Sequence, residues 1–156
     1  MKRFKFTLEA VQTVRERAAR EALENYARAL RVKTSAEAAL ADAEHAQESQ
    51  LVAWRRMMRQ NGFSPSEMLQ NEHARAMLEA RRNERVEEVR KASEAAAKAQ
   101  ATFQLAQQKS DVVERFHTRQ RNEFNLNALK EEQHFLDELA GNRRESGLFE
   151  KGPTHA

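Results

Sequence analysis

Two pairs of residues have the spacing of metal ligands, Glu114 with His117 and Glu131 with His134. Residues three positions apart share one face of a helix, and Glu-x-x-His motifs of this kind hold carboxylate-bridged di-iron centres. Such a centre needs motifs on different helices that converge inside a bundle, whereas both motifs here fall on one expected helix. We therefore interpret the four side chains as solvated groups on a helix surface, and we expect neither a metal site nor a cofactor.

Nucleophilic catalysis has no support in the sequence. There is no cysteine, so a thiolate nucleophile, a disulfide and a thiolate zinc site are excluded. The serines fall in expected turns or on helix surfaces, and no strand-turn-helix elbow or glycine-rich phosphate loop is present. Two helices also form no concave pocket that excludes water. The sequence therefore predicts a protein that is not an enzyme.

The composition is typical of long helices. Charged residues make up 33% of the chain and aromatic residues 6%, with only 4 glycines and 2 prolines. The 27 basic residues are interleaved with 24 acidic ones, which indicates a solvated helix surface rather than a basic face for nucleic acid. No apolar run has the length of a signal peptide or a membrane span. We expect a cytoplasmic protein that binds no nucleic acid.

Apolar residues recur at intervals of three and four along two segments, as they do on one face of a helix. The pattern predicts a helix over about 7–61, a turn over about 62–65 and a second helix over about 66–140. The expected fold is all-α, a long antiparallel two-helix coiled-coil hairpin over 1–141. The glycine- and proline-containing tail over 142–156 is predicted to be disordered.

The segment between the two helices carries signals for a helix end and a new start. Gly62 suits the left-handed conformation that ends many helices. Ser64 is expected to cap the second helix, with Pro65 at its first position and Glu67 completing a capping box. Phe63 and Met68 are expected to form a hydrophobic staple across the cap. All of these assignments are structural, and none implies chemistry.

Because the turn is short, residue i of the first helix is expected near residue 126 minus i of the second, as a rough register. Leu23 is then expected near Phe103, and Leu40 near Val86. Leu8 reaches only to about residue 118, which leaves about 22 residues of the second helix without a partner in the chain. Their exposed apolar stripe predicts an interaction surface: Phe124, Leu126, Leu129, Phe135, Leu136 and Leu139.

Two segments at the ends of the chain have a specific residue pattern. The first 17 residues read Met-Lys-Arg-Phe-Lys-Phe-Thr-Leu-Glu-Ala-Val-Gln-Thr-Val-Arg-Glu-Arg. The segment from Leu129 reads Leu-Lys-Glu-Glu-Gln-His-Phe-Leu-Asp-Glu-Leu-Ala-Gly-Asn-Arg. Both segments resemble the FliJ family of the flagellar protein export apparatus. The resemblance implies a coiled coil similar to the central stalk of rotary ATPases. It also implies binding to the export ATPase FliI, to the gate protein FlhA and to export chaperones, with promotion of ATPase ring assembly and activity.

The resemblance and the unpaired stripe together suggest two contact regions. Contact with the ATPase is expected at the terminal end, through Phe4, Phe6, Leu8, Val11, Phe124, Leu126, Phe135, Leu136 and Leu139. Contact with the gate is expected near the turn, where Trp54-Arg55 matches an aromatic-arginine pair of the family, through Leu51, Trp54, Arg55 and Leu78. We expect a monomer, or weak self-association, at the cytoplasmic face of the flagellar basal body.

Two other interpretations stay open at this point. The chain is also compatible with the YscO-type stalk protein of a non-flagellar type III secretion system, which a gene neighbourhood of needle and effector proteins would favour. The second alternative is an unrelated coiled-coil scaffold or nucleic-acid-binding protein. Binding to nucleic acid would weaken steeply as salt is added, which distinguishes it from the other two.

Overall fold

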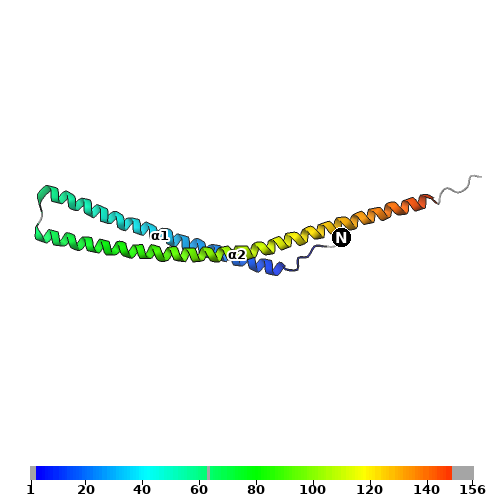
Figure 1. The fold of residues 1–156 in the computed structure, drawn as a ribbon, viewed down its shortest axis with the longest axis horizontal. Coiled ribbons are helices and arrows are strands. Elements are labelled where there is room, and N and C mark those ends of the chain that lie inside the picture. The colour runs from blue at the N-terminus through cyan, green and yellow to red at the C-terminus, as the bar shows by residue number, and fades with distance from the viewer. Residues whose placement is uncertain (1–2, 63, 149–156) are drawn as a thin grey trace, which may run out of the picture. The chain divides into compact units, whose positions relative to one another are not determined.

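The computed structural model describes residues 3–62 and 64–148, with the side chains of Asn61 and of 143–148 left out. It contains two helices, α1 over Glu9–Asn61 and α2 over Pro65–Leu148 (Figure 1). Within these two described ranges there is no strand. The predicted all-α fold of two long helices that pack against each other is confirmed.

The turn between the helices follows the local signals in the sequence. Gly62 has a φ of 63°, in the left-handed region that favours glycine. The backbone N–H of Ser64 donates to Oε2 of Glu67 at 2.7 Å, and the backbone N–H of Glu67 donates back to Oγ of Ser64 at 3.2 Å. This reciprocal pair is the predicted capping box, and α2 begins at Pro65. The proposed staple partner Phe63 lies outside the described residues.

The capping box predicts a pH-dependent start of α2. Two hydrogen bonds, first from the backbone N–H and then from the hydroxyl of Ser64, lower the pKa of Glu67 below its ordinary value of 4.5. A group whose pKa is lowered by folding stabilises the fold above its unfolded pKa and loses that effect as the pH falls through the folded pKa. We therefore expect the first turn of α2 to fray as the pH falls below about 4.5.

The measurement is the 13Cα chemical shift of residues 65–68, which reports helix population, as the pH is lowered. Glu67→Gln should flatten this pH dependence, because a neutral amide does not titrate. Glu72→Gln, at an exposed position farther along α2, is the matched control and should leave it unchanged. Identical titrations of the unchanged chain and of Glu67→Gln would contradict the prediction.

The helix ends differ in part from the predicted ones. α1 begins at Glu9 instead of about residue 7, with the N–H of Gln12 donating to the carbonyl of Leu8 at 2.9 Å. α2 continues through Gly141 to Leu148, so 142–148 are helical instead of part of a disordered tail. A single glycine with ordinary φ costs a helix only about 1 kcal/mol and does not have to end it. Residues 149–156 lie outside the described residues.

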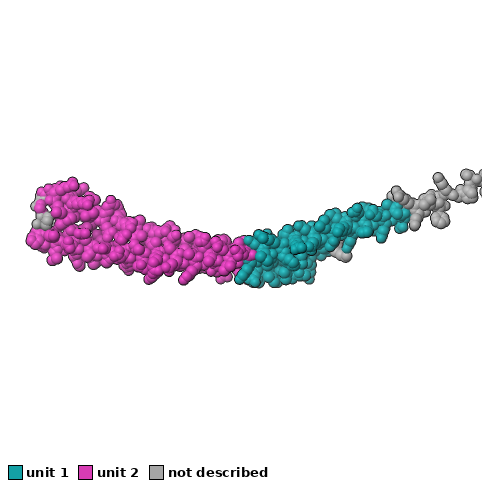
Figure 2. All heavy atoms as spheres, viewed as in Figure 1, with its two compact units in different colours: residues 1–15, 109–156 teal, residues 16–108 magenta. Residues whose placement is uncertain are grey.

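The chain divides into two compact units (Figure 2), and each helix contributes to both. Unit 2, over 16–108, contains the turn and an antiparallel pair of helical segments. Three side-chain pairs cross between its helices: Tyr26 stacks on Phe103 at 6.3 Å, Gln50 donates to Asn71, and Arg82 lies 3.6 Å from Glu44. Their residue numbers add up to 129, 121 and 126 where the prediction gives 126, so the predicted register holds to within about one and a half helical turns.

Alanines form the buried line between the helices of unit 2, which we call the alanine seam: Ala19, Ala22, Ala43, Ala92 and Ala96, each at most 7% exposed. Leu23, which follows Ala22 in the chain, is 47% exposed, and the ring that stacks on Phe103 is that of Tyr26, one turn farther along α1. Ala19, Ala22 and Tyr26 follow one another at intervals of three and four residues and so lie on the same face of α1. The ring of Tyr26 therefore contacts Phe103. Small side chains allow close approach of the helices but bury little apolar area.

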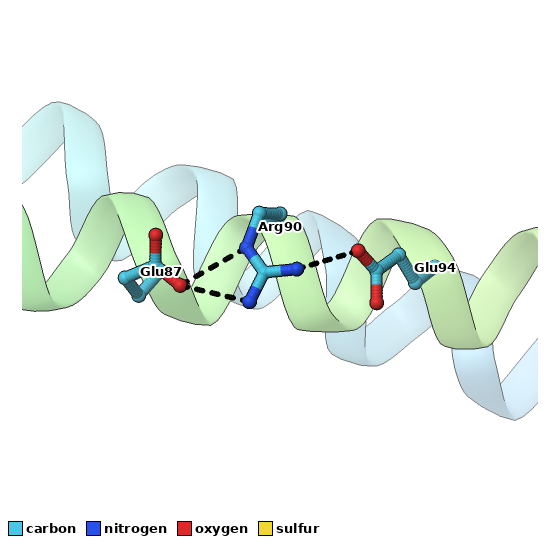
Figure 3. A network of polar contacts seen from close by, with 3 residues as sticks. All are labelled: Glu87, Arg90 and Glu94. Carbon is cyan, nitrogen blue, oxygen red and sulfur yellow. Dashed lines mark hydrogen bonds and ion pairs between the residues drawn. The ribbon is translucent and has the colours of Figure 1, made fainter.

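Ion pairs along the surface of α2 support the helix in unit 2. Arg90 lies between Glu87 and Glu94, at 3.0 Å and 2.6 Å from their carboxylates (Figure 3). Pairs three and four residues apart stabilise a helix by about 0.2–0.5 kcal/mol each. The three side chains are more than half exposed, so their contribution is to helix formation and not to a core.

Candidate protein-binding surfaces

The first described residues of unit 1 precede α1, with neither helix nor strand over 3–6 and a turn over 7–8, and we call them the N-terminal strap (residues 3–8). Exposure alternates along 3–6, as it does where the chain is extended and successive side chains point to opposite sides. Phe6 is accordingly buried, at 7% exposure, and Phe4 is half-buried, whereas Arg3 and Lys5 are exposed. The strap therefore turns its two rings towards α2 and its two charges towards solvent.

The strap and α2 share an aromatic cluster of Phe4, Phe6, Phe116, His117 and Phe124. The ring of Phe6 lies 6.2 Å from that of Phe116, and it meets the His117 ring edge-on at 4.7 Å. Phe4 lies 5.7 Å from His117 and 5.5 Å from Phe124. Edge-on and tilted rings at these separations attract one another beyond their apolar contact. His117 is half-buried among phenyl rings, so the prediction that it is a solvated surface histidine is wrong.

The strap changes which of the expected ATPase contacts are accessible. Phe124 is half-buried against Phe4, so the expectation that it begins an exposed stripe is wrong. The reason is geometric: an extended chain advances about 3.3 Å per residue and a helix about 1.5 Å. A few residues of strap therefore cover about twice as many residues of α2. Phe4, Phe6 and Phe124 are engaged inside unit 1.

Beyond Phe124, α2 exposes large apolar side chains. Leu129, Phe135, Leu136 and Leu139 are 61%, 61%, 63% and 47% exposed. Together with Ala128 they recur at helical spacing on one face, and we call this set the C-terminal stripe. Leu126 is 58% exposed but lies on another face, at the end of a hollow lined by polar residues such as Arg115 and Asn122. Leu8 and Val11 are 37% and 41% exposed.

The residues expected to contact the gate lie near the turn of unit 2. Leu51 and Leu78, from different helices, line one hollow together with Gln47, Gln50, Arg75 and Glu79. Trp54 is half-buried and Arg55 is exposed. The structure thus brings the two leucines together across the helix pair and leaves the tryptophan partly accessible.

Exposed methionines near the turn were missed as candidate contacts. Met57, Met58, Met68 and Met77 are 41%, 45%, 48% and 62% exposed. Methionine is flexible and polarisable, and it is frequent on surfaces that adapt to a partner. The signal was present in the sequence, because four of the 5 methionines fall within this short stretch.

Neither metal ligation nor a membrane span is found in the described part of the chain. Within 3–62 and 64–148, no three histidine or acidic side chains are grouped as a metal site requires. Neither helix, over the same residues, has an apolar stretch that could cross a bilayer.

Comparison with models of known protein families finds a match over most of the chain. The family model described as "Flagellar FliJ protein" matches residues 4–145, which is nearly the whole chain. No curated protein and no solved structure is significantly similar to the chain. The matched range includes the N-terminal strap from Phe4, both helices as far as residue 145, and the C-terminal stripe. The chain belongs to the FliJ family of flagellar proteins.

Proposed function

We propose that this chain is a non-enzymatic stalk component of the flagellar type III export apparatus. It binds the export ATPase FliI through the terminal end of its helices and the gate protein FlhA through the region of the turn. Binding promotes assembly and activity of the ATPase ring, and the chain also handles export chaperones. It acts at the cytoplasmic face of the basal body. The observation that carries the proposal is the exposed C-terminal stripe.

The C-terminal stripe has the features of a helix that docks in a groove. Its four large side chains are each about half exposed or more, on the part of α2 that lies beyond the aromatic cluster. A contiguous apolar face on a single amphipathic helix usually marks a protein-protein contact, with anchors three, four and seven residues apart. Membership of the FliJ family makes the export ATPase the expected partner for this end of the molecule.

The test is the hydrolysis rate and hexamer population of FliI, measured with the chain at several ratios. The proposal predicts a saturable rise in both. A chain truncated after Asn127 keeps the strap and the aromatic cluster but lacks the stripe from Ala128 onwards, and it should give no rise. No stimulation and no co-elution with the full chain would instead favour the YscO-type or the unrelated-scaffold interpretation.

Gate binding predicts a separate effect near the turn. Trp54→Ala should weaken binding to FlhA by about tenfold or more, since partly exposed tryptophans are frequent anchors of interfaces. Binding to FliI should be unchanged. The matched control is Val32→Ala, at a position of unit 2 that is 61% exposed and far along α1 from the turn. An equal loss of both affinities in Trp54→Ala would contradict separate contact regions.

A further inference from the structure

A carboxylate lies in the middle of the C-terminal stripe. The residues that share a helix face with Glu132, three and four positions away, are Ala128, Leu129, Phe135 and Leu136. Glu132 itself is exposed, like the three large apolar side chains around it. The neighbours of this charge on the helix face are thus apolar. None of the four positions three and four residues away, from which a lysine or arginine could form an ion pair with Glu132, is basic.

A partner that covers the stripe must therefore cover Glu132 as well. Leu129 and Phe135, on either side of it, are each 61% exposed and contribute much of the area that such a contact buries. Removing an ionised carboxylate from water is strongly unfavourable unless a cation and hydrogen bonds compensate it. A purely apolar groove would leave that charge buried and uncompensated.

The charge pattern also argues against a second copy of this chain as the occupant. Two stripes packed face to face, parallel or antiparallel about their centre, would bring one Glu132 close to the other. Like charges in such a contact repel each other. The stretch 128–141 adds three further acidic residues, Glu131, Asp137 and Glu138, against the single basic residue Lys130. Complementarity requires a basic partner.

We infer that the occupant of the C-terminal stripe is an apolar groove of the export ATPase that holds an arginine or lysine side chain opposite Glu132. The inference rests on the proposed function and specifies the chemistry of the partner surface. The cation satisfies Glu132 when the groove excludes water, and it fixes the register of the helix in the groove.

The test compares the affinity of full-length variants for FliI. Glu132→Gln should lose about tenfold or more, because it leaves a cation of the partner uncompensated. Glu132→Leu should lose at least as much, although it adds apolar area to the stripe. Asp137→Asn is the matched control, since five residues place Asp137 about 140° around the helix from Glu132. It should change the affinity by less than about twofold.

Each other outcome overturns the inference. Tighter binding by Glu132→Leu would show a groove that is apolar throughout, and unchanged binding by Glu132→Gln would show a carboxylate that stays in water. Equal losses in Glu132→Gln and Asp137→Asn would indicate a diffuse attraction between net charges and not a paired cation. Failure of the unchanged chain to bind FliI would overturn the proposed function itself, and that result is distinct from the other three.

Discussion

Replacing Phe135, Leu136 and Leu139 together by alanine is expected to weaken binding to FliI by about a hundredfold or more. Burial of a large apolar side chain in an interface contributes about 1.5–3 kcal/mol, so the loss of three exceeds the 2.7 kcal/mol that corresponds to about a hundredfold change. The helix should remain, because these side chains are 61%, 63% and 47% exposed and alanine favours helices. Calorimetric affinity and circular dichroism measure the two effects.

A matched triple variant distinguishes the stripe from a general loss of exposed apolar area. Val32, Leu105 and Val112 are 61%, 58% and 65% exposed and lie outside the C-terminal stripe. Their joint replacement by alanine should leave the affinity for FliI unchanged. If the stripe variant instead loses most of its helical signal, those residues hold the fold together and the stripe is not a free binding surface.

Phe6→Ala is expected to release the N-terminal strap from α2. Phe6 is the most deeply buried residue of the strap, at 7% exposure, and contacts both Phe116 and His117. Replacing a buried phenylalanine by alanine typically costs about 3–5 kcal/mol. Of the described ring contacts between the strap and α2, those of Phe4 then remain. The strap should therefore detach while the helix content, to which it contributes nothing, stays the same.

The ring protons of Phe124 report this release, because the strap ring that they contact is Phe4, which Phe6→Ala leaves in the chain. In the docked strap they lie against the ring of Phe4, whose ring current shifts their NMR resonances. In Phe6→Ala the resonances should move towards those of an exposed phenylalanine. Lys5→Ala, at an exposed position of the same strap, should leave them in place. Unmoved Phe124 resonances in Phe6→Ala would show that Phe4 alone holds the strap.

Local signals in the sequence were sufficient for the turn and for the pairing of the helices. Gly62, Ser64 and Glu67 act over three or four residues, and their roles need no distant partner. Once the turn is placed, the rise per residue is equal in the two helices, so simple subtraction gives the register. The accuracy of this register is seen at Phe103, whose observed partner Tyr26 lies about one helical turn from the predicted partner Leu23.

The features that the sequence did not reveal depend on contacts between distant segments. Leu23 and Val86 were expected between the helices, but they are 47% and 37% exposed, and the buried line of this helix pair consists of alanines, whose small side chains let the backbones approach closely. The strap was missed because its rings find partners more than a hundred residues away. Alternation of Arg3-Phe4-Lys5-Phe6 was the available signal, since it is the period of an extended segment.

The alanine seam also determines how this protein responds to heat and denaturant. Among the described residues the buried apolar side chains are Phe6 and five alanines, so unfolding brings little new apolar surface into water. The heat-capacity change of unfolding and its dependence on denaturant both scale with that surface. We therefore expect both quantities to be small for a chain of this length, and melting to be broad. A partner that covers the C-terminal stripe would add buried area, so we expect the complex to melt more sharply than the free chain.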